Sequence, residues 1–207
     1  MTLTRRRLSS LAHRGDFLTN GVAYLLIALF FALERALRTG QEARSLEHGP
    51  FDRQSSERLG RAYGLAGSML LLAPLLNLAH IGYARRATAA GWSGVGLMVG
   101  GILVRVWANT TLGTFYTRTL RVAEGQRLVE HGPYRLVRHP GYSGSLLLWS
   151  GAGLASANWL VSIVVTGAML SAYRYRIKIE EAMLDETFGV AYGRYRCRTW
   201  KLIPYLY

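Results

Sequence analysis

Apolar residues in this chain are gathered into long blocks, and most charged residues lie between the blocks. The first block covers 20–33 and extends to about 16 and 37, the second covers 62–83, and the third covers 91–107. At 1.5 Å per residue, helices of about 20 apolar residues cross a hydrocarbon core about 30 Å thick. The pattern therefore predicts three membrane-spanning helices, with Pro74 tolerated inside the second.

The longest apolar run, 142–173, has 32 residues and no charged side chain. One straight helix of that length measures about 48 Å, well beyond the hydrocarbon thickness of about 30 Å. Ser156-Ala157-Asn158 lies near the middle of the run and supplies turn-forming residues. We therefore expect a tight helical hairpin, followed within 174–207 by a C-terminal helix and a tail that contains Pro204.

These elements predict an all-α polytopic membrane protein of about five transmembrane helices, with the helical hairpin in the C-terminal half. We expect a single integral membrane domain, 1–207. Within it, 1–107 holds the first three spans and their loops, and 108–207 holds the motif, the hairpin and the C-terminal helix.

The third block is rich in glycine, and its spacing at first resembles a dinucleotide-binding loop. Such a loop follows a strand and opens a helix, whereas Gly94-Val95-Gly96 and Gly100-Gly101 lie inside a predicted span. Gly96 and Gly100 therefore favour close helix packing in lipid. We expect no Rossmann domain.

The formal net charge is +13, and the position of the basic residues decides what this charge implies. Of the 25 Lys and Arg, 19 lie in the first, third and C-terminal connecting segments, and 6 lie elsewhere. The bias places these three segments in the cytoplasm, although four basic residues at the N-terminus argue the other way. Basic residues beside apolar blocks favour anionic lipid headgroups, so we expect a lipid bilayer and no nucleic acid as partner.

Metal chemistry has little support in the sequence. The single cysteine, Cys197, permits neither an internal disulfide nor a cysteine-based metal cluster, and no histidine pair has the HExxH spacing. We expect no metal site.

Polar chemistry is densest in the segment 132–142, GPYRLVRHPGY, which packs two Pro, two Tyr, two Arg and one His between apolar runs. Gly132-Pro133 and His139-Pro140 fix turns, which favours a preformed polar pocket. Each residue also has an ordinary interpretation. The tyrosines suit an interfacial belt and the arginines suit lipid phosphates, while His139 suits a turn that only shapes the chain.

A second polar cluster, RIKIEE, follows the hairpin at 176–181. Arg176 and Glu180 are four residues apart, so they share one face of a predicted helix. A surface ion pair is the ordinary interpretation. Glu180 and Glu181 are adjacent acids in an otherwise basic segment, which favours a helix whose Glu180 points toward a pocket.

GPYRLVRHPGY, the apolar hairpin, RIKIEEAML, FGVAYGRY and Ile203-Pro204 resemble the isoprenylcysteine carboxyl methyltransferase family of integral membrane enzymes. The resemblance is close over 126–204 and includes RVWANTTLG at 105–113, whereas the first 90 residues share only apolar spans. It implies S-adenosylmethionine as methyl donor, bound without a Rossmann fold. The implied cofactor pocket is cytosolic and is built from 108–142 and the C-terminal helix.

The resemblance also implies a set of site residues. The implied cofactor-binding residues are Gln126, Arg127, Leu128, Val129, Tyr134, His139, Pro140, Gly141, Tyr142 and Glu180. Gln126 stands where family members often carry His, which leaves its side-chain contact open. Arg176 falls on the arginine that meets the substrate, so the expected catalytic residues are Arg176, Glu180 and His139.

The expected function is methylation of a carboxylate, isoprenylcysteine-like, or of another nucleophile on a lipophilic substrate. A carboxylate is already ionised, so it needs positioning rather than a strong base. Phospholipid amines and small thiols are alternative acceptors, and a thiol would need activation to thiolate, with His139 as a conceivable helper. A small membrane transporter or assembly subunit is the alternative of another class. Charges at the ends of spans and the absence of inverted repeats argue against it.

Overall fold

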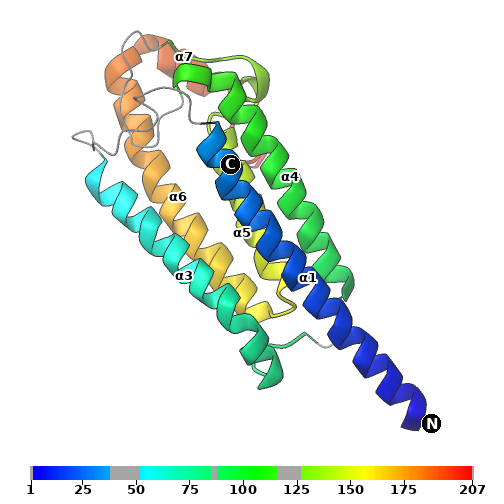
Figure 1. The fold of residues 1–207 in the computed structure, drawn as a ribbon. Coiled ribbons are helices and arrows are strands. Elements are labelled where there is room, and N and C mark those ends of the chain that lie inside the picture. Colours follow the sequence, from blue (N-terminus) through cyan, green and yellow to red (C-terminus); the bar gives the residue numbers. More distant parts are fainter. Residues whose placement is uncertain (1, 38–51, 85–87, 116–126, 207) are drawn as a thin grey trace.

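The computed structural model describes residues 2–37, 52–84, 88–115 and 127–206, and its long helices run side by side (Figure 1). In chain order the elements are α1 (Thr2–Ala36), α3 (Arg53–Leu78), α4 (Thr88–Leu112), the 3-10 helices η1 (Gly113–Phe115) and η2 (Gly132–Arg135), α5 (Pro140–Ala155), α6 (Trp159–Phe188) and α7 (Val190–Arg198). Within these ranges the β-type pairing consists of isolated bridges. The all-α class is confirmed.

The three apolar blocks of the N-terminal half lie in α1, α3 and α4, except that α3 ends at Leu78 and leaves 79–83 of the second block outside it. The segments Leu18–Ala36, Gln54–Leu78 and Ala89–Leu112 are long and apolar enough to cross a membrane. Pro74 lies inside α3, as expected. The chain is therefore an integral membrane protein, while the total of five spans stays a prediction.

The predicted hairpin is present, with α5 and α6 joined by a turn at 156–158. Ala157 has φ +55° between the two helices. The Asn158 side chain caps α6 by accepting a hydrogen bond from the backbone N–H of Val161 at 3.1 Å. The turn residues identified in the sequence thus reverse the chain where expected.

The C-terminal half differs from the prediction in one respect. Residues from 174 onward do not begin a new helix, because α6 continues without a break to Phe188. The residues after Tyr173 are mainly good helix formers, and no proline interrupts them. Gly189, with φ +50°, then ends α6, and the short helix α7 follows. The second polar cluster, 176–181, therefore lies on α6, the second helix of the hairpin.

Helices α4 and α5 approach backbone to backbone through paired glycines. A Cβ atom added to Gly94 would lie 2.5 Å from the carbonyl oxygen of Gly151, and one added to Gly101 would lie 2.5 Å from that of Gly144. Glycine packing in this span is thus present, but the expectation that Gly96 and Gly100 provide it is wrong. Among the described residues, neither has an atom within 4 Å of an added Cβ atom, because both lie on another face of α4.

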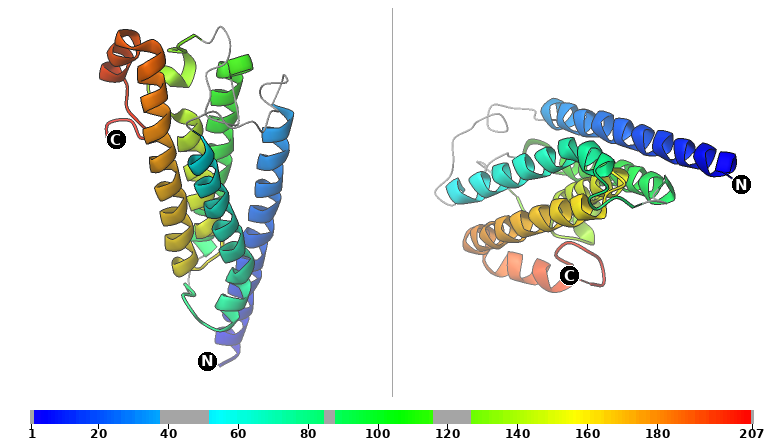
Figure 2. Two further views of the ribbon diagram at one scale, coloured as in Figure 1. Left: turned by 90° about the vertical axis from the view of Figure 1, so that its left-hand side faces the viewer. Right: turned by 90° about the horizontal axis from the view of Figure 1, so that it is seen from below.

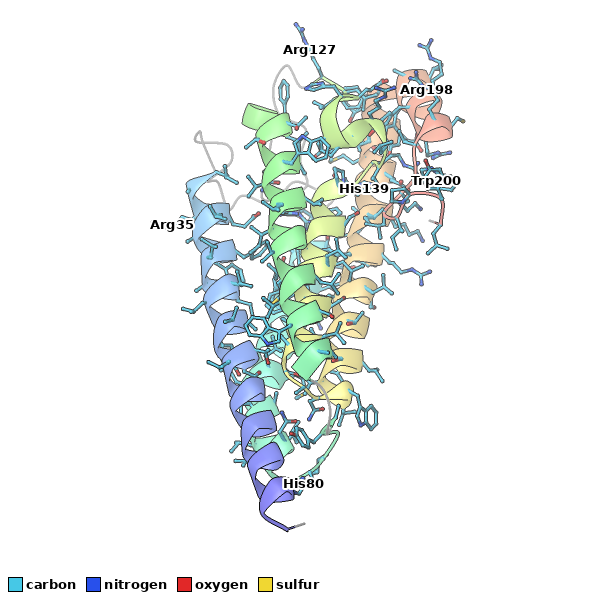
Figure 3. All side chains as sticks on the ribbon, turned by 90° about the vertical axis from the view of Figure 1, so that its right-hand side faces the viewer. Arg35, His80, Arg127, His139, Arg198 and Trp200 are labelled. Atoms are coloured by element: carbon cyan, nitrogen blue, oxygen red, sulfur yellow. The ribbon has the colours of Figure 1, made fainter. Side chains whose placement is uncertain are left out.

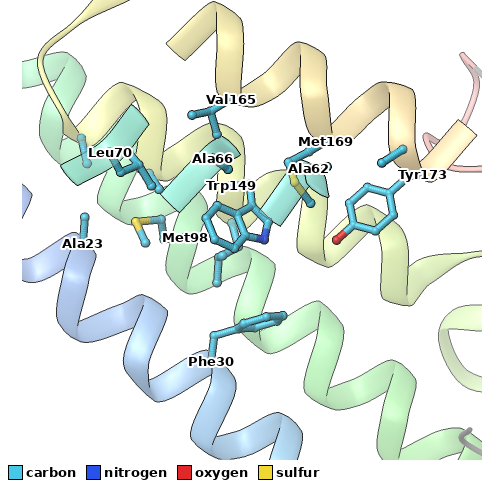
Figure 4. Packing of buried hydrophobic residues seen from close by; sticks show 14 of the residues in the cluster. Ala23, Phe30, Ala62, Ala66, Leu70, Met98, Trp149, Val165, Met169 and Tyr173 are labelled. Atoms are coloured by element: carbon cyan, nitrogen blue, oxygen red, sulfur yellow. The ribbon is translucent and has the colours of Figure 1, made fainter. Parts of the chain in front are cut away.

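Helix α5 occupies the middle of the bundle. Its Trp149 is 2% exposed and lies among side chains of four other helices, including Phe30, Ala66, Met98 and Met169 (Figure 4). The other views show α7 at the end of the bundle opposite the N-terminus (Figure 2). The central position of α5 fixes its first turn, which carries the end of the 132–142 motif, at that same end.

Candidate active site

A cavity of about 400 Å³ lies at the end of the bundle that holds α7. This volume is in the range of small-molecule sites, about 300–1,000 Å³. The walls come from the long helices, from α7 and from the segment before η2. They include Phe30, Phe31, Glu34, Ser56, Leu59, Tyr63, Arg105, Asn109, Arg127, Leu128, Val129, Tyr134, His139, Gly141, Tyr142, Tyr173, Arg176, Glu180, Met183, Tyr192 and Tyr195.

The structure brings nearly all of the implied site residues to this cavity. Those that line it are Arg127, Leu128, Val129, Tyr134, His139, Gly141, Tyr142, Arg176 and Glu180. Pro140 is buried in the first turn of α5 and is not part of the lining. Gln126 lies outside the described residues. In Figure 3, Arg127 and His139 lie toward the cavity end, whereas His80 lies at the opposite end.

The two polar clusters meet through Tyr142. Its hydroxyl donates to Glu180 Oε2 at 2.7 Å and accepts from Arg176 Nε at 3.0 Å. The His139 ring stacks on the Tyr142 ring with centroids 5.7 Å apart, and His139 Nδ1 lies 3.9 Å from Glu180 Oε1. Residues of the 132–142 motif and of α6 thus line one cavity.

Glu181, the residue after Glu180, connects the 132–142 motif to the C-terminal tail. Its carboxylate lies 3.0 Å from Arg138 Nε, 3.2 Å from Lys201 Nζ and 3.4 Å from His139 Nε2. Glu181 is past the end of the apolar run of the hairpin. Burial alone would raise its pKa, but hydrogen bonds and charges from His139, Arg138 and Lys201 outweigh burial and lower the pKa to about 2.

The tail also pairs with the backbone of the motif. Arg138 N donates to Trp200 O at 2.8 Å, and His139 N donates to Lys201 O at 3.2 Å. Tyr134 is buried nearby, and burial raises its pKa well above the ordinary value, so its hydroxyl stays protonated at neutral pH. The backbone on either side of His139 is therefore held by fixed partners before any ligand arrives.

The sequence is similar to known methyltransferases. A model of the phospholipid methyltransferase family matches residues 89–191. The chain is 28% identical over 150 residues to a probable protein-S-isoprenylcysteine O-methyltransferase of Oryza sativa subsp. indica, covering 72% of this chain and 78% of the relative. It is 31% identical over 116 residues to protein-S-isoprenylcysteine O-methyltransferase A of Arabidopsis thaliana, covering 55% of this chain and 58% of the relative.

A solved structure has the same fold. The eukaryotic intramembrane Ras methyltransferase (isoprenylcysteine carboxyl methyltransferase) superposes with a TM-score of 0.67 at 22% identity, covering 93% of this chain and 68% of that chain. In sequence and in fold, this chain is therefore similar to the isoprenylcysteine carboxyl methyltransferases. It is a membrane methyltransferase, and its family resemblance, drawn from the sequence motifs, is confirmed.

The region that the family model matches, 89–191, runs from the start of α4 into α7. Two buried acids that touch the cavity residues lie outside that region, and sequence reasoning missed both. Asp52, 0% exposed, lies 3.1 Å from Arg176 NH1, and Glu34, 5% exposed, lies 2.8 Å from Arg105 Nε. The one available signal was Arg105 itself, because an arginine near the end of an apolar block needs a partner.

Proposed function

We propose that this methyltransferase moves a methyl group from S-adenosylmethionine to a carboxylate on a lipophilic, isoprenylcysteine-like molecule. One observation carries the proposal. Arg176 and Glu180 of α6 share a single cavity with His139 and Tyr142 of the 132–142 motif, at one end of a membrane-embedded bundle. A cation, an acid and aromatic faces are thereby gathered where a polar donor and a lipid-borne acceptor can meet.

The residues present fit S-adenosylmethionine, which carries a sulfonium, an amino group and a carboxylate. Glu180 and the stacked rings of Tyr142 and Tyr173 suit its cationic parts. Arg127 and His139 suit its carboxylate and the adenine edge. The proposed cofactor-binding set is the one that the sequence motifs imply, including Gln126 and Pro140. When bound, the donor would supply the methyl group and would leave as S-adenosylhomocysteine.

The acceptor side of the cavity is proposed to be the side of α1 and α3. Phe30, Phe31, Leu59 and Tyr63 line it there and offer apolar and aromatic surface. We propose that the apolar tail of the acceptor enters sideways between the spans and that Arg176 orients its carboxylate. Orientation of an ionised acceptor against a bound donor supplies several kcal/mol of rate enhancement without a strong base.

The cavity end is proposed to face the cytoplasm. The described parts of the three connecting segments with most Lys and Arg meet at this end, and 19 of the 25 basic residues belong to those segments. An excess of basic residues marks the cytoplasmic side of a membrane protein. We further propose that 1–207 forms one integral membrane domain, since its N-terminal and C-terminal halves both line the cavity.

Methylation of a phospholipid amine is the second candidate, favoured by the family model that matches 89–191. The two candidates differ in the charge of the acceptor. The buried guanidinium of Arg176, 4% exposed, is better suited to an anionic acceptor than to an amine.

A transfer assay tests the proposal. Purified protein in lipid nanodiscs receives S-adenosylmethionine labelled in the methyl group, together with farnesylcysteine that has a free carboxylate. We expect label in a base-labile methyl ester and none with the matching carboxamide, which lacks the accepting oxygen anion. Label in the amine of phosphatidylethanolamine would favour the second candidate. Absence of label in lipophilic acids, thiols and phospholipids alike would overturn methyl transfer to any of these acceptors.

A further inference from the structure

Asp52 is the most deeply buried acid near the cavity, and it precedes α3 by one residue. Its carboxylate accepts hydrogen bonds from Arg176 NH1 at 3.1 Å and from Ser56 Oγ at 3.0 Å. A buried carboxylate is costly unless it is paired and hydrogen-bonded. The position therefore depends on its contact with Arg176.

Asp52 stands at one end of a continuous polar line. From Arg176 the line runs through Nε to the Tyr142 hydroxyl at 3.0 Å and then to Glu180 Oε2 at 2.7 Å. The guanidinium is planar and rigid, so a partner that fixes NH1 also fixes the direction in which Nε points. Ser55 and Ser56 of α3 accept from the same NH1 at 3.2 and 3.3 Å, which adds to this hold.

A second arginine that lines the cavity is also paired with a buried acid. Arg105 Nε donates to Glu34 Oε1 at 2.8 Å, and Asn109 Nδ2 donates to the same oxygen at 2.9 Å. In both ion pairs the arginine lies within 89–191, the region that the family model matches, and the acid lies on an N-terminal helix or directly before one. Two acids that precede residue 89 therefore supply counter-ions to arginines of the matched region.

From this geometry we propose that Asp52 is a positioning residue for methyl transfer. It acts through Arg176, holding the guanidinium so that Nε meets Tyr142 and the acceptor carboxylate is presented in one orientation. The inference rests on the proposed function and extends it to a residue outside the matched region. Glu34 is expected to hold Arg105 in the same manner.

Steady-state kinetics of Asp52→Ala and Asp52→Asn provide the test. Because a displacement of about 1 Å costs up to about 100-fold in rate, we expect Asp52→Ala to lower kcat/KM for the acceptor by about 10- to 100-fold. Asp52→Asn keeps an oxygen that accepts from NH1 but loses the charge, so its loss should be smaller, about 3- to 10-fold. The dissociation constant of S-adenosylhomocysteine should stay within about threefold of wild type in both variants.

Matched controls separate positioning from a general effect on the fold. Glu57 lies on the same first turns of α3 and is exposed, so Glu57→Ala should leave every constant within about twofold. In an Arg176→Lys background, which lacks the planar fork, adding Asp52→Asn should cost less than it does in wild type. If Asp52→Ala does not fold, the near-isosteric Asp52→Asn decides the question.

Two results overturn this proposal. One is wild-type kcat/KM in folded Asp52→Asn and Asp52→Ala. The other is a loss of S-adenosylhomocysteine affinity in proportion to turnover, because Asp52 would then support the whole cavity rather than Arg176. Failure of the wild-type protein to transfer methyl groups at all would instead refute the proposed function, so the two failures are distinguishable.

Discussion

Polar side chains are buried at both ends of the bundle, but the two ends use them differently. At the end away from the cavity, Asn158 donates to Asn77 Oδ1 and to Ile81 O, both at 2.8 Å, and Asn77 donates to Ser156 O at 2.8 Å. Thr19 donates to Ala155 O at 2.9 Å. These groups are neutral, they bond to one another or to backbone, and they do not line the cavity.

The cavity end instead buries charged groups beside unfilled volume. Arg176, Glu34, Arg105 and Glu180 all line the cavity, and each takes part in an ion pair or a charged hydrogen bond. Charges are expensive to bury, whereas a closed network of amides and hydroxyls stabilises the fold. The contrast indicates that the far end holds the hairpin in place and that the cavity end is organised to receive a ligand.

The largest expected effect comes from Arg176→Ala, which removes the proposed anchor of the acceptor. We expect turnover to fall by roughly 100- to 1,000-fold, as for loss of a preorganised group at a reaction centre. S-adenosylhomocysteine binding, measured by calorimetry, should persist because the donor has other contacts. Arg174 is exposed two residues earlier on α6, so Arg174→Ala is the matched control and should keep wild-type turnover. Normal turnover in Arg176→Ala would refute the assigned role.

The next largest effect is expected from a substitution at the end of the bundle away from the cavity. Asn158→Ala removes the cap of α6 and leaves the Ile81 carbonyl and the Asn77 side chain without a partner in Asn158. We expect a loss of about 3 kcal/mol in the free energy of unfolding, measured in mixed micelles. Folded Asn158→Ala should bind S-adenosylhomocysteine with wild-type affinity. A weakened affinity at unchanged stability would contradict the assignment of structural support to the far end and of ligand binding to the cavity end.

The glycine contact between α4 and α5 links the two ends and gives a smaller effect. A Cβ atom at residue 101 would overlap the Gly144 backbone, so Gly101→Ala should lower the free energy of unfolding by about 1–3 kcal/mol. Gly96→Ala meets open space and should be neutral or stabilising by up to about 1 kcal/mol. Equal unfolding curves for the two variants would argue against the backbone contact.

The smallest expected effect is a dependence of stability on pH at the cavity end. The pKa of Glu181 is about 2 in the folded protein, below its ordinary 4.5, so its contribution is fully present above about pH 4.5. That contribution is lost as pH falls toward 2. Glu181→Gln should therefore flatten the fall in unfolding midpoint over this range. An unchanged pH profile in Glu181→Gln would show that Arg138, Lys201 and His139 do not act through this carboxylate.

The sequence predicted the parts of the site that depend on local pattern. Ser156-Ala157-Asn158 marked the reversal of the hairpin, and the spacing of Arg176 and Glu180 placed them on one helix face. These features need only the helical repeat and turn chemistry, which are readable within a few residues.

Contacts between segments that are far apart in the chain could not be predicted from the sequence. Asp52 meets Arg176 across 124 positions and Glu34 meets Arg105 across 71, and no local pattern announces either contact. The packing glycines were assigned to Gly96 and Gly100 because the face that α4 turns to α5 depends on the position of α5. The sequence motifs predicted many of the residues that line the cavity. The acids that pair with Arg176 and Arg105 could be identified only from the fold.

The most direct test of the central claim is calorimetric titration of S-adenosylhomocysteine into detergent-purified protein and its cavity variants. We expect a dissociation constant in the micromolar range for wild type and no detectable binding to Glu180→Ala or Tyr142→Ala. Exposed Glu186, farther along α6, serves as control, and Glu186→Ala should bind as wild type does. Undetectable binding to the wild-type protein, or binding that survives both cavity substitutions, would contradict the claim that the two polar clusters enclose one methyl-donor site.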